Sequence, residues 1–146
     1  MKLLIIQLSD MHFENTIQTH SIHIDKMMTA IKSVAIADEC IVVVSGDMAC
    51  KGKKTDYNYV KGFIAALCRS LTENGYRKKI HVFTVPGNHD INFSPLNVGI
   101  DDIINAYDNK AVEELKKIYI DNMQDYFAYA AELGCFADDK VVSKKL

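Results

Sequence analysis

Three short apolar runs divide the N-terminal part of the chain, and each ends abruptly in polar residues and glycine. The runs cover residues 2–8, 40–44 and 80–85 and are rich in Val, Ile and Leu. Runs of this length with little alternation of apolar and polar residues are typical of β-strands that are buried on both faces, as in a parallel sheet covered by helices. We therefore expect three buried, parallel strands.

The segments between these runs carry apolar residues at helical spacing. Residues 21–38 repeat Ile, Met and Val every three or four positions, and residues 60–71 form a cleaner apolar stripe. Thr55 or Asp56 can cap the start of this second helix. The pattern predicts that a helix connects each strand to the next.

The remainder of the chain is expected to be helical and then polar. A short segment at 101–107 and a longer helix fall within a helical region at 99–134, and a polar tail follows at 137–146, like the start of a strand that does not develop. The predicted order is β-α-β-α-β-α-α, which is an α/β fold with a parallel sheet. We expect one partial domain, 1–146, with its informative motifs in residues 1–93.

A polar cluster follows each of the three runs. The clusters are Ser9-Asp10-Met11-His12, Ser45-Gly46-Asp47 and Pro86-Gly87-Asn88-His89-Asp90. Taken singly, each has a structural explanation, because Asp and Asn bond to nearby backbone and Gly permits positive φ. However, the carboxyl ends of parallel strands meet at one edge of a sheet, and Asp, His and Asn are metal ligands. Three such clusters at equivalent positions therefore favour a shared metal site.

The same residues carry a resemblance to a known family. Asp10-x-His12, Gly46-Asp47 and Gly87-Asn88-His89-Asp90, in this order, resemble the motifs of the calcineurin-like metallophosphoesterase superfamily, and Lys51-Gly52 followed by Tyr57 and Tyr59 is similar to its smaller phosphodiesterases. The resemblance implies an α/β sandwich of two sheets flanked by helices. It also implies two divalent metal ions, for which mixed Asp, His and Asn ligands suit Mn, Fe or Zn.

The resemblance implies a metal-binding role for four residues. Asp10 and His12 would bind the first ion, Asp47 would bridge both ions, and Asn88 would bind the second ion. A bridging carboxylate suits this position, because its negative charge brings two cations close together.

Two further residues would act on the substrate by the same resemblance. His89 would protonate the leaving group, and Asp90 would orient His89. An imidazole titrates near neutral pH and suits this task. The implied activity is metal-dependent hydrolysis of a phosphodiester or phosphomonoester by a water that two metals activate.

The histidines of the chain end at His89, whereas the superfamily also supplies a lone His and a later Gly-His-x-His. We therefore expect the N-terminal half of a longer polypeptide, with the second sheet largely missing, one sheet face or edge uncovered, and weak or no activity by itself. Its partners would be a phosphoester substrate and the missing C-terminal half. The alternative is a non-catalytic regulatory or scaffolding module that keeps the fold without a complete metal site.

Composition adds few constraints. A net charge of −2 gives no argument for an anionic membrane, and leaves nucleic acid as a substrate without support. No apolar stretch approaches the roughly 20 residues needed to cross a bilayer. The four cysteines lack C-x-x-C spacing and are interpreted as buried, reduced thiols, so a cytoplasmic location is expected.

Overall fold

The computed structural model describes residues 2–14, 20–32, 37–74, 79–94, 117–133, 136–137 and 142–143. The segment predicted at 101–107, the cysteine at position 135 and most of the polar tail lie outside these residues.

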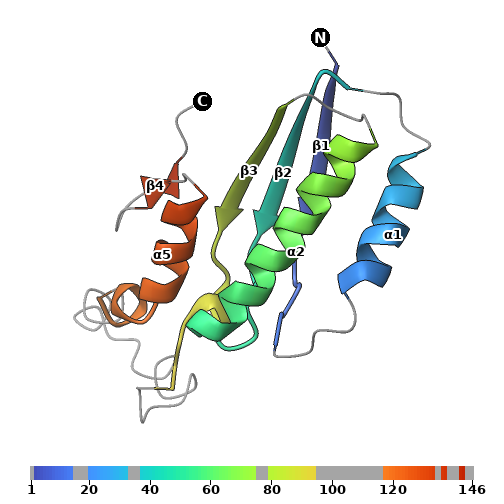
Figure 1. Ribbon diagram of the computed structural model, residues 1–146. Coiled ribbons are helices and arrows are strands. Elements are labelled where there is room, and N and C mark those ends of the chain that lie inside the picture. The colour runs from blue at the N-terminus through green and yellow to red at the C-terminus, as the bar shows by residue number, and fades with distance from the viewer. Residues whose placement is uncertain are drawn as a thin grey trace.

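The three predicted strands form one parallel sheet. Strands β1 (Leu3–Leu8), β2 (Glu39–Ser45) and β3 (Lys79–Val85) are hydrogen-bonded in the order β1-β2-β3 (Figure 1). Their carboxyl ends therefore lie at the same edge of the sheet, which confirms the α/β fold class and the placement of the three polar clusters.

Helices α1 (His20–Ile31) and α2 (Lys54–Glu73) connect the strands, as the apolar stripes predict. Helix α2 begins one residue before Thr55. Asp56 lies inside its first turn, where its carboxylate accepts the backbone N–H groups of Lys51, at 3.0 Å, and Lys53, at 3.4 Å. Asp56 therefore satisfies amide groups at the helix start from the third helical position instead of the cap position.

The hydrophobic core lies between one face of the sheet and the helices. Ile6, Val42 and Val82 are in register across the three strands and are buried together. The core residues that the helices contribute are Ile24, Met28 and Ile31 of α1, Val60, Phe63, Ile64, Leu67 and Leu71 of α2, and Tyr126, Tyr129 and Ala130 of α5 (Gln124–Glu132). Helices α1, α2 and α5 thus all pack on the same face.

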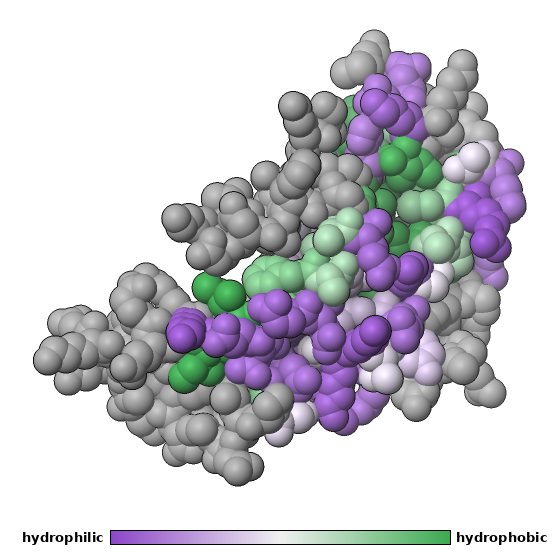
Figure 2. All heavy atoms as spheres, turned by 60° about the vertical axis from the view of Figure 1, so that its left-hand side comes forward, coloured by the Kyte–Doolittle hydropathy of each residue, from purple (hydrophilic) through white to green (hydrophobic). Residues whose placement is uncertain are grey.

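On the opposite face of the sheet, apolar side chains of β1 and of the end of β3 are exposed, whereas His81 within β3 is buried. The side chains of Leu3, Ile5 and Val85 are 45%, 61% and 47% exposed. Hydrophobic residues also reach the surface beside hydrophilic ones in the view of Figure 2. The prediction that all three strands are buried on both faces is therefore wrong, whereas the expectation of an uncovered face or edge agrees with the exposed side of β1. The apolar runs do not alternate in sequence, but the burial of β1 and β2 does alternate.

The C-terminal part is helical where it is described. Residues 117–121 are helical, and α5 follows after a two-residue turn, in agreement with the helix predicted within 99–134. Strands β4 (Phe136–Ala137) and β5 (Val142–Ser143) form a short antiparallel pair, so the tail contains strand structure instead of a single undeveloped strand. The phenol of Tyr126 joins α5 to β3 by donating to the backbone carbonyl of Thr84 at 3.1 Å.

Two further expectations can be compared with the described residues. In this part of the chain, no helix is long and apolar enough to cross a membrane. Cys40, Cys50 and Cys68 carry reduced thiols, and Cys40 is fully buried whereas the other two are half-buried.

The neighbouring residues Ile5 and Ile6 provide a matched test of the one-sided core. Ile6→Ala is expected to lower the free energy of unfolding by roughly 2–5 kcal/mol, because the buried side chain leaves a cavity. Ile5→Ala should cost less than about 1 kcal/mol, because that side chain is already mostly in water. Urea unfolding measures both values, and equal losses would contradict the one-sided arrangement.

Candidate metal centre

The loops that leave β1 and β2 run side by side and are bonded through their backbones. The N–H of Asp10 donates to the carbonyl of Gly46 at 3.3 Å, and the N–H of His12 donates to the carbonyl of Asp47 at 2.9 Å. These bonds extend the pairing of β1 and β2 beyond the strands themselves. They hold the first two polar clusters of the sequence together.

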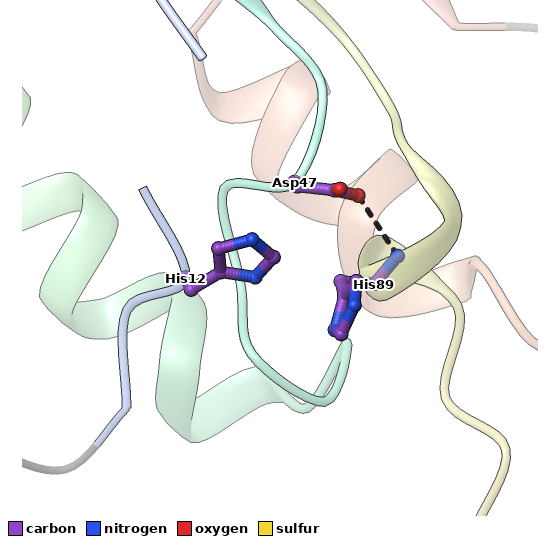
Figure 3. A group of neighbouring side chains, drawn as sticks. All are labelled: His12, Asp47 and His89. Carbon is purple, nitrogen blue, oxygen red and sulfur yellow. Dashed lines mark hydrogen bonds between the residues drawn. The ribbon is translucent and has the colours of Figure 1, made fainter. Parts of the chain in front are cut away.

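His12, Asp47 and His89 come from three different loops and converge at one point (Figure 3). Each can offer one donor atom, and these atoms lie within 4.8 Å of one another. The rings of His12 and His89 meet edge to face, with their centroids 4.5 Å apart. Two imidazoles and a carboxylate at this spacing can bind a single divalent ion, and the donor set suits Mn, Fe or Zn.

Asp47 holds the second and third loops in contact. Its Oδ1 accepts the backbone N–H of His89 at 2.9 Å. Gly87 permits this approach, because a Cβ at position 87 would lie only 2.1 Å from the same oxygen. Glycine is therefore required here by steric contact with Asp47.

The ring of His89 is oriented by a backbone carbonyl. Nδ1 of His89 lies 3.0 Å from the carbonyl oxygen of Cys50. Since a carbonyl oxygen only accepts hydrogen bonds, Nδ1 must carry a proton, which leaves Nε2 available to the site. A backbone carbonyl of this kind is a common partner of metal-binding histidines, because it fixes both the tautomer and the ring orientation.

Asp90 is fully buried and contacts the two loops that carry Asp47 and His89. Its carboxylate accepts four hydrogen bonds at 2.9–3.2 Å, from the backbone N–H groups of Met48, Ala49 and Gly87 and from the hydroxyl of Tyr57. This carboxylate therefore bonds the loop after β2 to the loop after β3.

Asp90 is expected to orient His89, but the described hydrogen bonds of its carboxylate go to other groups. The carboxylate contacts loop backbone and Tyr57, while the ring of His89 bonds to Cys50. The expectation that Asp90 orients His89 stays a prediction. The described contacts instead link Asp90 to the backbone on both sides of the metal centre.

Asp10 and Asn88 lie at the same edge of the sheet. Asp10 is exposed and lines a hollow of about 440 Å³ together with His12 and His23. Asn88 is exposed at the start of the short helix η2 (Asn88–Asp90) and lines a smaller hollow of about 240 Å³ with His89. The structure thus brings all the predicted ligands to one edge, where the donor atoms of His12, Asp47 and His89 lie within 4.8 Å of one another.

Three predicted ligands have strained backbones. Asp10, His12 and Asp47 have φ angles of 52°, 45° and 49°. These angles lie in the left-handed region, which residues other than glycine rarely adopt. Such residues cluster at functional sites, where the required side-chain position outweighs the cost. Nothing in the sequence indicates this strain, because none of the three is a glycine.

An ion pair joins the loops at the rim of the site. The ammonium group of Lys51 bonds to the carboxylate of Glu14, and this hydrogen bond raises the pKa of Lys51 and lowers that of Glu14. Both side chains are more than half exposed, so the pair contributes little to stability. Lys51 therefore has a partner in the protein itself.

Backbone strain at His12 can be measured with two small substitutions. His12→Gly and His12→Ala both remove the imidazole, but only glycine tolerates a φ of 45° without strain. The glycine variant is expected to have the higher free energy of unfolding, by about 1 kcal/mol. Equal stability in urea would contradict the left-handed conformation, and neither variant should retain the metal affinity of the unchanged chain.

Comparisons with known proteins agree with this geometry. No curated protein matches the chain. A model of the calcineurin-like phosphoesterase family matches residues 3–143, a range that includes all three polar clusters and most of the chain. Proteins of this family typically bind divalent metals, and the described residues contain a group that can hold such an ion. The chain belongs to the calcineurin-like phosphoesterase family.

Proposed function

We propose that this protein hydrolyses phosphoesters, either diesters or monoesters, with a water that two divalent metal ions activate. The observation that carries the proposal is the convergence of His12, Asp47 and His89 at the carboxyl edge of the sheet. The family match over residues 3–143 supports the same chemistry. Mn, Fe and Zn all suit the donors, and reduced cysteines are compatible with a cytoplasmic location.

In this proposal, the ligands at the carboxyl edge of the sheet divide into one that bridges both ions and others that bind one ion each. Bound divalent ions would neutralise phosphoryl charge and lower the pKa of a coordinated water. Asp47, which the backbone N–H of His89 holds in place, would bridge the two ions. Asp10 and His12 would complete one side of the site, and Asn88 the other.

His89 has two candidate tasks. The family resemblance implies that it protonates the leaving group, and its place beside His12 and Asp47 also allows it to bind an ion through Nε2. In both cases the carbonyl of Cys50 has the same effect, because it fixes the proton on Nδ1 and directs Nε2 into the site.

The four proposed ligands, even with His89 as a fifth, fill only part of the coordination spheres of two ions. We therefore propose that a further segment of the same polypeptide supplies the remaining donors, with a phosphoester as substrate. Nucleic acid as that substrate has no support in the net charge of −2. The second candidate function is a regulatory or scaffolding module, for which metal binding without turnover would be the signature.

Asp47→Asn tests the proposed activity. This change keeps the size of the side chain but removes the charge that balances the cations, so Mn²⁺-dependent hydrolysis of bis-p-nitrophenyl phosphate by the full polypeptide should fall at least about 100-fold. Asp25→Asn, on the exposed face of α1, is the matched control and should retain full activity. Unchanged turnover in Asp47→Asn would defeat the assignment.

His89→Gln separates the two tasks of that residue. If His89 acts as an acid, the Mn²⁺ dissociation constant should stay the same, while the rate falls more for esters with poor leaving groups than for nitrophenyl esters. If His89 binds metal, the dissociation constant should rise about tenfold or more. Calorimetric titration with Mn²⁺ and a series of leaving groups measure both effects, and a variant that changes neither would exclude His89 from the site.

A further inference from the structure

We propose that Tyr57 is a positioning residue of the metal centre, acting through Asp90. The proposal rests on the proposed metal site and extends it to a residue of helix α2 that offers no ligand atom to that site. Tyr57 is the fourth residue of α2, and it is buried in the core with its hydroxyl directed at Asp90.

The contact between Tyr57 and Asp90 is short and buried. The phenol oxygen lies 3.0 Å from Oδ1 of Asp90 and 3.2 Å from the backbone carbonyl oxygen of the same residue. Both are acceptors, so the phenol must be the donor. Burial, together with the nearby carboxylate, raises the pKa of Tyr57, so the hydroxyl keeps its proton.

The effect of this bond reaches both loops of the site. The Asp90 carboxylate also accepts the N–H groups of the two residues that directly follow Asp47, and that of Gly87, which lies two residues before His89. The position of the carboxylate therefore sets the distance between the loop that carries Asp47 and the loop that carries His89. Tyr57 is the side-chain donor among these contacts, and it connects the loops to α2.

The phenol ring cannot easily leave this position. Tyr57 stacks on Tyr129 of α5, with ring centroids 5.4 Å apart and an interplanar angle of 24°, and the ring of Tyr126 lies 6.4 Å away. Packing of α5 on α2 thus fixes the ring, and the fixed ring fixes the hydroxyl. The Tyr57 hydroxyl is thus a rigid hydrogen-bond donor, and donors outside the ligand set help to fix the orientation of metal ligands.

Loss of the hydroxyl should therefore change metal affinity more than folding. Tyr57→Phe keeps the ring and its packing but removes one of the four hydrogen bonds to the buried carboxylate. The carboxylate is then free to shift toward its three backbone donors, which changes the spacing of Asp47 and His89. Removal of a residue that orients a metal ligand typically lowers metal affinity by 10- to 100-fold.

The test compares Tyr57→Phe with Tyr59→Phe, a half-buried tyrosine of the same helix. The Mn²⁺ dissociation constant is measured from the signal of free Mn²⁺ in electron paramagnetic resonance, and Tm is measured with and without Mn²⁺. We expect Tyr57→Phe to bind Mn²⁺ about tenfold more weakly and to lose much of the Tm increase that Mn²⁺ causes. Tyr59→Phe should keep the Mn²⁺ dissociation constant of the unchanged protein and the full Tm increase that Mn²⁺ causes.

A lower Tm in the absence of metal, with an unchanged dissociation constant, would show a merely structural role and overturn the proposal. If the full polypeptide without substitutions fails to bind Mn²⁺, the proposed function fails together with the role of Tyr57. If it binds Mn²⁺ and Tyr57→Phe binds equally well, only the role of Tyr57 fails, so the two failures are distinguishable. If Tyr57→Phe does not fold, Tyr129→Leu takes its place. This substitution removes the ring that stacks on Tyr57 and keeps the hydroxyl of Tyr57 itself. Unchanged Mn²⁺ affinity in that variant would equally overturn the proposal.

Discussion

The buried carboxylate of Asp90 is the interaction on which the candidate metal centre depends. A charged group without solvent is costly unless hydrogen bonds replace its hydration, and here four donors surround the two oxygen atoms. The donors come from the loop after β2, the loop after β3 and helix α2. One side chain therefore joins segments that are about 40 residues apart in sequence.

This anchoring explains how the strained ligands persist. Asp10, His12 and Asp47 all have positive φ, at a cost of order 1–3 kcal/mol each. The backbone bonds between the first two loops and the Asp90 contacts beneath them fix the chain on either side of these residues. Helices α1, α2 and α5 pack on one face of the sheet and form the core that stabilises the fold. This stabilisation offsets the free-energy cost of the strained backbone at the three ligands.

The sequence was sufficient for the strands, the connecting helices and the residues of the edge, because these follow from local patterns. Apolar runs set the strands, and the topology of a parallel sheet brings their carboxyl ends together. The runs themselves predict burial on both faces, and an uncovered face or edge was expected only from the resemblance to a family with two sheets. Ile5 and Ile6 are the same residue type, and their burial differs only because the helices cover one side.

The contacts between distant residues were also beyond the sequence. The motif that contains Asp90 suggests a partner for His89, whereas the hydrogen bonds of Asp90 go to Tyr57 and to loop backbone. Tyr57 belongs to the family resemblance only as a residue that follows Lys51-Gly52, and nothing local predicts that its hydroxyl reaches a residue 33 positions later. Positive φ at His12 likewise arises from the pairing of two loops and not from histidine itself.

The contact of Gly87 with Asp47 has a consequence for anyone who alters this edge. A methyl group at position 87 would overlap the carboxylate oxygen at 2.1 Å, so any side chain introduced there must displace Asp47 or the loop that carries it. The energetic effects of substitutions at the two positions will therefore not be additive. Redesign of either loop has to treat positions 47 and 87 as one unit, although 40 residues separate them along the chain.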